Sequence, residues 1–496
     1  MSVTRAATGG RRPRILLISL FHPELVRGGA QQVAFELFQG LQQRGDVDPV
    51  FLASIDSHYP ALYKSGARIT GFDGRPDEYV LLSRDYDSWW HKTSAPSTME
   101  ALAEFLLQIA PDVVHVHHFL TLGIDILTLI RRVLPSCRLV FTFHEFLSIC
   151  AADGHMVRKT DRSLCTHASQ VRCHQCIPER SPEQFMMRKM WFMRHFSQVD
   201  AFTCPSRFMI DHYVKWGIEA ERLSYVSNGQ RNYAAGGPLP AASKGRNRFG
   251  FFGQYVDVKG VQIILRAVTF LRAEGFTDFV VELNGDNLRY ASAPVRDEIL
   301  AFLKAEADRP AQDRIVTDNG SYEVSQLTSR MSRVDWCIVP SIWWESFGLV
   351  ISEAWMFGRP VICSNVGGMA ERNEHDVFAL QFPMGEPRAL AETIKRACTE
   401  PGLWDRLAQA LPNPPSREAM VEGFMQVYGV LEPAGQVPTT PATMANGVTA
   451  GAVPATAGLS VGRRKPAVVI PTRERTSERT SAVRGAGKPG SRPGTA

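Results

Sequence analysis

The chain has 496 residues, of which 44% are hydrophobic and 21% are charged. This composition is ordinary for a globular protein, and the length allows two or three domains with substantial cores, which excludes a chain that is disordered throughout. The formal net charge is +5, and the 55 basic and 50 acidic residues are scattered along the sequence. The charge pattern excludes a nucleic-acid-binding stripe, so we expect no nucleic-acid partner, whereas small acidic ligands stay open.

The N-terminal segment combines a basic stretch, Arg11 to Arg14, with the apolar run ILLISLF at 15–21. We interpret this run as a first buried strand and not as a secretory signal, because it is short and no small-residue cleavage site follows it. No other stretch contains the eighteen uncharged apolar residues that a transmembrane helix needs. We therefore expect a cytoplasmic protein with reduced cysteines.

Short apolar runs alternate with longer helical patterns between Ile15 and about Tyr213. The runs ILLISLF, VDPVFLAS, DVVHVHH, RLVFTFH and AFTCPS are typical of strands, and Gln31 to Arg44 has helical spacing. A Gly- and Pro-containing connection then leads to a second set, RFGFFGQY, FVVELNG, RIVTDNG, VDWCIVPS and PVICSN. This order predicts an α/β protein with two facing Rossmann-like domains, each built on a parallel sheet.

The same patterns suggest domain boundaries. We expect an N-terminal Rossmann-like domain over 12–215 and a second domain over 245–410. Ser416 is a plausible N-cap for a C-terminal crossover helix over 416–432 that packs back on the N-terminal domain. Ala, Thr, Pro, Gly and Arg then dominate the sequence, so we expect a disordered tail over 434–496.

Two features near the strand ends of the first domain indicate a ligand site. Gly28 and Gly29 follow the first strand and lead into a helix that begins near Ala30, where backbone N–H groups could approach an anion. A plain tight turn is the alternative. His144 stands just past a buried strand and is followed by Glu145. A position at the carboxyl edge of a sheet favours a functional histidine over a purely structural one.

The second domain offers a lysine at a helix start. Lys259 and Gly260 open a helix after a glycine-containing turn. The N-terminus of a helix repels a cation, so a lysine there makes sense if an anion such as a phosphate binds between them. A solvated surface lysine is the alternative.

Two carboxylates, Glu345 and Glu353, interrupt the apolar passage PSIWWESFGLVISEA. Their spacing lets both address one elongated ligand. We expect ESFG to form the turn into a helix, which leaves the N–H groups of Phe347, Gly348 and Leu349 available to oxygens of a ligand. Two solvated surface glutamates are the alternative.

Six segments occur in order between about residues 14 and 432: RGGAQQ, HE after an early strand, CPSRFM with VSNG, FFGQ with KG, VPSIWWESFGLVISEA, and GRPVICSNVGGMAE. Taken together they resemble the retaining glycosyltransferases of family 4, which have the GT-B fold. The resemblance implies transfer of a sugar from a nucleotide-sugar donor to a carbohydrate or lipid-linked acceptor, in surface polysaccharide or glycoconjugate assembly. A catalytically silent donor-binding homologue and a nucleotide-sugar epimerase are the alternatives.

The resemblance also implies residue roles. Gly29 would donate its N–H to the donor diphosphate, and Lys259 would neutralise that diphosphate as it leaves. Glu345, helped by nearby N–H groups, would bind the hydroxyls of the donor sugar, and Glu353 would bind those of the ribose. His144 would contact the sugar near its anomeric centre. The departing phosphate would take the proton of the acceptor, so catalysis would need no metal cofactor.

One position departs from the family pattern. Gln254 stands where the family usually has arginine, which removes one positive charge from the expected diphosphate site. A unit charge at about 4 Å is worth about 4 kcal/mol, before desolvation, at an effective dielectric constant near 20. Gln254 can still donate a hydrogen bond, and Arg246 or Arg248 could supply the missing charge if their strand edge faces the cleft.

Four of the nine cysteines are Cys150, Cys165, Cys173 and Cys176, in a Cys-rich loop over 150–176. In a reducing compartment their spacing, with one C-x-x-C pair, suggests a structural zinc site. Free thiols are the alternative, because the longer gaps match no strict zinc pattern.

The following segment, PEQFMMRKMWFMRHF at 182–196, has a helical pattern rich in Met, aromatic and basic residues. It could contact a membrane surface peripherally or receive a lipid-linked acceptor, and burial against the first sheet is the alternative. In the tail, KPAVVIPTRER is similar to the opening strand of a single-domain glycosyltransferase class. We interpret that fragment as a chance match or a remnant of a second domain.

Overall fold

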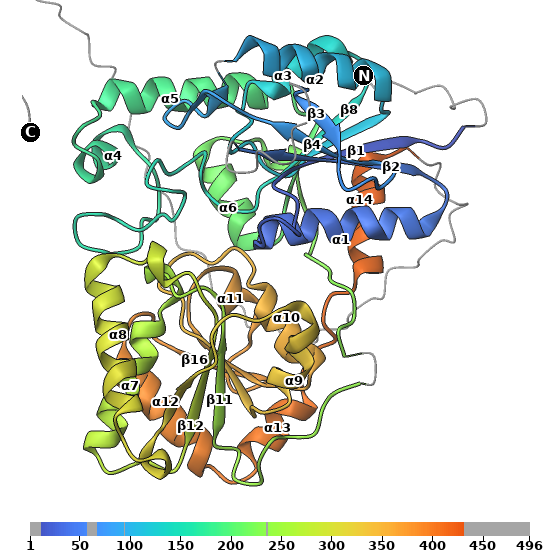
Figure 1. Ribbon diagram of the computed structural model, residues 1–496. Coiled ribbons are helices and arrows are strands. Elements are labelled where there is room, and N and C mark those ends of the chain that lie inside the picture. The colour runs from blue at the N-terminus through green and yellow to red at the C-terminus, as the bar shows by residue number, and fades with distance from the viewer. Residues whose placement is uncertain (1–10, 57–66, 94, 235–236, 431–496) are drawn as a thin grey trace, which may run out of the picture. The chain divides into compact units, whose positions relative to one another are not determined.

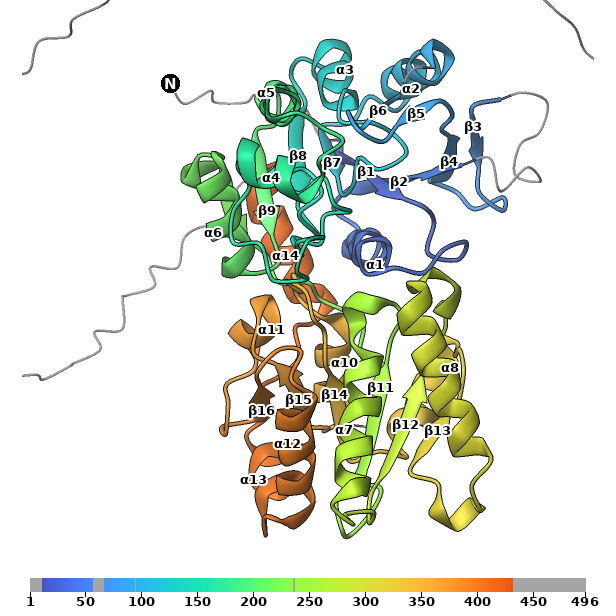
Figure 2. The ribbon, with the colours of Figure 1, turned by 90° about the vertical axis from the view of Figure 1, so that its left-hand side faces the viewer.

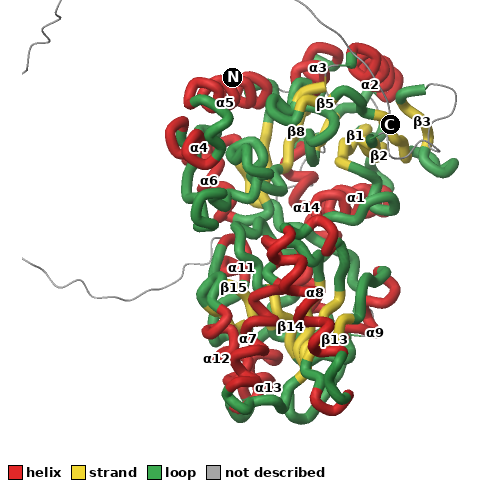
Figure 3. Tube along the Cα trace, turned by 60° about the vertical axis from the view of Figure 1, so that its left-hand side comes forward, coloured by secondary structure: helices red, strands yellow, loops and turns green. Residues whose placement is uncertain are grey.

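The structure is a computed structural model, and it describes residues 11–56, 67–93, 95–234 and 237–430. These residues form two mainly parallel sheets, each with helices on both faces (Figures 1 and 3). We name the part built on the first sheet the first lobe and the part built on the second sheet the second lobe. The expected tail over 434–496, including KPAVVIPTRER, lies outside the described residues.

The first lobe contains an eight-stranded sheet in the order β10-β9-β8-β7-β1-β2-β4-β3, and only β3 runs antiparallel to its neighbour. A short antiparallel pair, β5 and β6, stands apart from it. The strands are β1 (Arg14–Leu20), β2 (Asp48–Ile55), β3 (Ile69–Gly71), β4 (Glu78–Leu82), β5 (Tyr86–Asp87), β6 (Lys92–Thr93), β7 (Val113–Val116), β8 (Arg138–Thr142), β9 (Ala201–Cys204) and β10 (Leu223–Tyr225). The helices are α1 (Gly29–Arg44), α2 (Pro96–Ile109), α3 (Ile126–Val133), α4 (Gln170–Cys176), α5 (Pro182–Phe196) and α6 (Arg207–Trp216).

Both faces of the first sheet are buried. Along β1, Leu16 and Ile18 pack into a core with α2, α3, α5 and α6. Ile15 and Leu17 point the other way, into a second core with α1 and the last helix, α14 (Arg417–Tyr428). The two-residue period of a strand places alternate side chains on opposite faces, so a strand covered on both sides must be apolar throughout. This requirement explains the unbroken run ILLISL.

The second lobe contains a six-stranded parallel sheet in the order β13-β12-β11-β14-β15-β16. Figure 2 shows α7 and α12 side by side over one face, and α9, α10 and α11 pack on the other. The strands are β11 (Arg248–Phe252), β12 (Val280–Asn284), β13 (Val316–Asp318), β14 (Trp336–Val339), β15 (Val361–Ser364) and β16 (Ala379–Phe382). The helices are α7 (Val261–Ala273), α8 (Ala293–Ala307), α9 (Leu327–Met331), α10 (Leu349–Met356), α11 (Gly367–Arg372), α12 (Pro387–Thr399) and α13 (Leu403–Gln409).

Helix α14 returns from the end of the second lobe to the first lobe, where it contacts α1 (Figure 1). The side chain of Ser416 caps it by accepting a hydrogen bond from the Ala419 N–H, at 3.1 Å. A buried ion pair joins the two helices, because Arg417 Nε donates to Glu36 Oε2 at 2.6 Å. The crossover helix expected from the sequence is therefore present.

The strands expected from apolar runs are present in both sheets, with β1, β2, β7, β8 and β9 in the first and β11 to β15 in the second. The sequence analysis did not identify β3, β4, β10 or β16, which are three to five residues long. None of the helices in the described ranges is long and apolar enough to cross a membrane.

The ion pair between Glu36 and Arg417 should contribute strongly to stability. Both side chains are almost fully buried, so removing one charge leaves the other desolvated and unpaired. We expect Glu36→Gln to lower the free energy of unfolding by about 3 to 5 kcal/mol, measured by urea denaturation. Glu422→Gln is a matched control, because it removes the exposed pair that α14 makes with Arg44 and should cost at most about 1 kcal/mol. Equal losses in the two variants would contradict this role.

Candidate active site

Residues from both lobes line one cavity of about 530 Å³. This volume lies within the range of about 300 to 1,000 Å³ that is typical of small-molecule sites. All ten residues that the sequence analysis proposed for donor binding or catalysis line it. They are Gly28, Gly29, His144, Gln254, Lys259, Glu345, Phe347, Gly348, Leu349 and Glu353.

The strand order explains why these residues meet. In each sheet the winding direction reverses at one place, between β1 and β7 in the first lobe and between β11 and β14 in the second. Open parallel sheets bind ligands at the carboxyl ends of the strands beside such a reversal. Gly28 and Gly29 follow β1, Lys259 follows β11, and Glu345 follows β14.

Lys259 and Glu345 form an ion pair, with Lys259 Nζ 2.7 Å from Glu345 Oε2. The same oxygen accepts hydrogen bonds from Trp343 Nε1 at 3.0 Å and from Ser341 Oγ at 3.3 Å. The ammonium also lies 5.2 Å from the centre of the Trp343 ring. Three donors therefore hold one carboxylate oxygen at the edge of the cavity.

This ion pair was not expected from the sequence. It gives Lys259 a negatively charged partner within the protein itself. The lysine does stand just before the N-terminus of α7, where the helix dipole disfavours a cation. In this structure Glu345 supplies the compensating negative charge. A phosphate that binds Lys259 would have to share it with Glu345 or displace that carboxylate.

Two helix starts face the cavity without a side-chain cap, namely Gly29 of α1 and Leu349 of α10. They are close together, because a methyl group added at Gly29 would lie 3.8 Å from Leu349 Cδ1. Gly348, which precedes α10, has φ +76°, a value that favours glycine. The ESFG segment thus forms the turn into α10, as predicted, and two partial positive charges are directed at one space.

A close backbone contact fixes Lys259 relative to β14. The residue that follows it, Gly260, has φ +78°, and a Cβ there would overlap the carbonyl oxygen of Pro340 at the end of β14. Only glycine permits this approach. The turn after β11 and the turn after β14 are thereby packed together, which keeps Lys259 within reach of Glu345.

Glu353 also lines the cavity. Its carboxylate accepts a hydrogen bond from Gln230 Nε2 at 3.3 Å. Burial raises the pKa of Glu353, while Gln230 and nearby Arg27 act in the opposite direction. A half-buried carboxylate with unused acceptor capacity is suited to bind hydroxyl groups.

His144 contacts a second histidine, with its Nε2 3.0 Å from Nδ1 of His117, and the two rings are stacked. Burial, and then the nearby His117, lower the pKa of His144 well below 6.5. The ring is therefore neutral at physiological pH. His117 comes directly after β7 and His144 lies just beyond the neighbouring strand β8, so the parallel pairing of these strands places the two rings together.

The structure corrects the proposal that Arg246 or Arg248 replaces the charge missing at Gln254. Arg246 donates to Asp405 at 2.9 Å and stacks on Trp404. Arg248 donates to Glu282 at 2.7 Å and begins β11. Both are at the amino end of that strand, whereas the cavity is at its carboxyl end. Neither arginine lines the cavity.

The cavity has a cation that the sequence analysis missed. Arg27 lines it, donates to the carbonyl oxygen of Tyr322 in the second lobe at 3.1 Å, and lies over the ring of that tyrosine. Its position directly before Gly28, at the expected anion site, could have indicated this role from the sequence. Trp343 and Asn228 also line the cavity and were not singled out.

The other predicted features lie elsewhere. The four cysteines line a separate cavity in the first lobe. Helix α5 buries Phe192 and Phe196 against the first sheet, as the burial interpretation expects, and exposes Met186, Met187 and Met190. Peripheral membrane contact through these methionines stays a prediction.

Two glycosyltransferase families match the chain in tandem. The family described as Glycosyltransferase Family 4 matches residues 27–230, and the family described as Glycosyl transferases group 1 matches residues 246–400. The first match falls on the first lobe and its exit, and the second falls on the second lobe.

Similar proteins include an alpha-D-kanosaminyltransferase of Streptomyces kanamyceticus, 25% identical over 186 residues, which are 37% of this chain and 45% of that protein. A D-inositol 3-phosphate glycosyltransferase of Salinispora arenicola is 29% identical over 218 residues, 40% of this chain and 46% of that protein. The chain therefore matches less than half the length of these curated relatives.

Among solved structures, the Anabaena protein HepE in complex with UDP superposes with a TM-score of 0.58 at 16% identity, over 84% of this chain and 100% of that one. Sucrose-phosphate synthase of Thermosynechococcus elongatus gives 0.60 at 18% identity, over 84% and 98%. These likenesses establish the fold as that of the GT-B class. With the two family matches, the chain belongs to the glycosyltransferases of the family 4 type.

Glu145, next to His144, should make stability depend on pH. Burial raises the pKa of its carboxyl to about 8, so its ionisation costs more in the folded than in the unfolded chain. Stability should fall as pH rises from about 4.5 to 8, and Glu145→Gln should remove part of that fall. Urea denaturation at pH 5.5 and 8.5 tests this, with the exposed Glu179→Gln as control. An unchanged pH dependence in Glu145→Gln would contradict the burial effect.

Proposed function

We propose that this protein transfers a sugar from a nucleotide-sugar donor to a carbohydrate or lipid-linked acceptor, with retention at the anomeric carbon. The observation that carries the proposal is the single cavity that brings together two uncapped helix starts, two cations and two carboxylates, one buried and one half-buried. HepE, which shares the fold, binds UDP and UDP-glucose. Assembly of surface polysaccharide or another glycoconjugate on the cytoplasmic side is the setting we propose.

The charges of the cavity suit the cleavage of a glycosyl-phosphate bond. Negative charge builds on the leaving diphosphate in the transition state, and positive charge builds on the sugar ring. Lys259, Arg27 and the start of α1 at Gly29 would stabilise the diphosphate, because preorganised groups directed at developing charge contribute most to the rate. To do this, the Lys259 ammonium would weaken or break its contact with Glu345 and bind the phosphate instead.

The acids and the histidine would hold the two ends of the donor. Glu345 would accept hydrogen bonds from sugar hydroxyls, and Glu353, near Gln230, would accept those of the ribose. His144 would lie near the anomeric carbon, where its neutral ring adds no positive charge to an already cationic sugar. The departing phosphate would accept the proton of the acceptor, so a protein base and a catalytic metal ion are not part of the proposal.

Variants of the ion pair test this assignment. We expect Lys259→Ala and Glu345→Gln each to lower turnover of a nucleotide sugar by about 100- to 1000-fold, the usual effect of losing one group that stabilises transition-state charge. Circular dichroism should show that the fold survives. Lys304→Ala is the matched control, since that lysine is exposed on α8, and it should keep full activity.

A donor must first be found by screening nucleotide sugars, beginning with UDP-glucose, for thermal stabilisation of the full chain. Turnover is then followed by release of the nucleoside diphosphate, with reactions run without added divalent ions. Full activity in either Lys259→Ala or Glu345→Gln would contradict the site assignment. Donor binding without transfer or hydrolysis in the unaltered protein would favour a silent binding homologue instead.

Gln254 allows a gain-of-charge test. It is exposed and lines the cavity near the turn after β11. If the diphosphate binds beside Lys259, Gln254→Arg should tighten binding of a nucleoside diphosphate by about tenfold, which corresponds to about 1.4 kcal/mol. Calorimetry measures this, and Gln326→Arg serves as a surface control with the same change in net charge. Weaker binding in Gln254→Arg would place the diphosphate elsewhere.

A further inference from the structure

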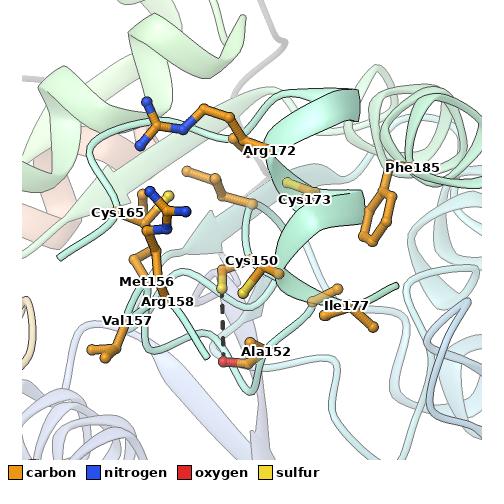
Figure 4. A pocket seen from close by; sticks show the side chains of 14 residues that line it. Cys150, Ala152, Met156, Val157, Arg158, Cys165, Arg172, Cys173, Ile177 and Phe185 are labelled. Atoms are coloured by element: carbon orange, nitrogen blue, oxygen red, sulfur yellow. Dashed lines mark hydrogen bonds between the residues drawn. The ribbon is translucent and has the colours of Figure 1, made fainter. Parts of the chain in front are cut away.

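Four cysteines of the Cys-rich loop converge on one small cavity in the first lobe. Cys150 comes from the segment after β8, Cys165 from the middle of the loop, and Cys173 and Cys176 from α4. All four line a cavity of about 30 Å³, and Figure 4 shows the side chains of Cys150, Cys165 and Cys173 around it. A space of this size accommodates a single ion or one to two water molecules.

The other walls of this cavity are mainly apolar, with Ile149, Met156, Val157, Ile177 and Phe185 among them. Sulfur atoms are thus the principal side-chain ligands available inside it. The backbone N–H of Lys159 donates to Cys176 Sγ at 3.2 Å, whereas the thiols of Cys150 and Cys165 donate to the carbonyl oxygens of Ala152 and His167. Such N–H donors commonly surround the ligands of a metal site and stabilise their negative charge.

A buried arginine provides the second observation. Arg188 of α5 is 3% exposed, and its guanidinium donates to three carbonyl oxygens, those of Trp89, Leu147 and Ser148. Carbonyl groups satisfy its hydrogen bonds but do not neutralise its charge. Burial lowers the pKa of Arg188 to about 10, and the nearby Cys150, Cys173 and Glu145 act in the opposite direction.

A buried cation without a compensating anion is costly. Four thiolates around a Zn²⁺ ion carry a net charge of −2, which Arg188 would partly balance, so the cluster and the arginine would stabilise each other. The two neutral alternatives, free thiols and disulfides, leave the guanidinium without that compensation. The buried charge of Arg188 therefore favours bound zinc over free thiols and over disulfides.

We propose that Cys150, Cys165, Cys173 and Cys176 bind one Zn²⁺ ion, with loss of four thiol protons to solvent. Within the described ranges, no group of three or more His, Cys, Asp or Glu side chains is already arranged to hold a metal ion. The thiols would therefore turn toward a common centre as the ion binds. Four protein ligands leave no open position on the ion, so the site is structural and not catalytic.

The zinc would act on the active site through the loop. The backbone oxygen of Cys165 accepts a hydrogen bond from Trp344 Nε1 of the second lobe at 2.9 Å. In the same loop, His155 packs against Trp343 and Arg162 lies 3.6 Å from Asp257. Fixing Cys165 to the ion would hold the loop against the Trp343–Glu345 segment. This consequence rests on the proposed function, whereas the metal site itself does not.

The experiment measures metal in the full chain purified under reducing conditions from zinc-containing medium. We expect one zinc per chain, released when an organomercurial modifies the thiols. Cys173→Ser and Cys176→Ser should each lose the zinc, and Cys398→Ser, a cysteine of α12 in the second lobe, should retain it. When the metal-free protein is titrated with Co²⁺, it should develop the intense near-ultraviolet charge-transfer bands and the visible bands of four-thiolate coordination. This measurement uses the unaltered protein, so it does not depend on whether the variants fold.

Two further readouts separate the possible outcomes. Trypsin should cut the loop at exposed Lys159 and Arg162 at least tenfold faster after zinc is removed. Absence of zinc with four freely reactive thiols, or with a disulfide among them, would overturn the site. Zinc bound as expected, but with unchanged loop cleavage and nucleotide binding after its removal, would overturn the link to the active site alone.

Discussion

The ion pair between Lys259 and Glu345 is the interaction on which the account of this protein depends. It joins the turns after two neighbouring strands at the point where the second sheet reverses its winding direction. Each partner stabilises the other in its position. The Glu345 carboxylate compensates the charge of Lys259 at an unfavourable helix terminus. Lys259, with Trp343 and Ser341, supplies the hydrogen bonds that the nearly buried carboxylate needs. A donor diphosphate would compete for the lysine, and a donor sugar would compete for the glutamate. Under the proposed function, the pair would hold both side chains in the positions from which a nucleotide sugar binds them.

Connections between the lobes extend this arrangement. Helix α14 is held on α1 by Glu36 and Arg417, and the backbone N–H of Arg231, at the exit from the first lobe, donates to the same glutamate at 3.1 Å. On another side, Glu371 of α11 accepts hydrogen bonds from the N–H groups of Arg207 and Phe208 at the start of α6. A carboxylate at a helix N-terminus is favourable. With the contact between Trp344 and the Cys-rich loop, these links determine how closely the two halves of the cavity approach each other.

Much of this could be predicted from the sequence because the signals were local. Strands buried on both faces are largely apolar, which allowed β1 and β14 to be predicted, and Gly348, with φ +76°, marks the turn into α10. Strands β10 and β16 contain the polar residues Ser224 and Gln381, so neither shows an unbroken apolar run. Partnerships between distant side chains are also not encoded locally. The pairs Lys259–Glu345 and His117–His144 depend on strand order, and Arg417–Glu36 depends on the return of α14 to the first lobe. Whether Arg246 or Arg248 faces the cavity likewise depends on which end of β11 they occupy.

The most direct test of the central claim is a crystal structure of the full chain with a nucleoside diphosphate. The account predicts phosphate oxygens within hydrogen-bonding distance of Lys259 Nζ and the Gly29 N–H, with Lys259 moved from its 2.7 Å contact with Glu345. A diphosphate bound away from this cavity, or bound inside it with Lys259 still fully engaged by Glu345 and distant from the phosphates, would contradict it.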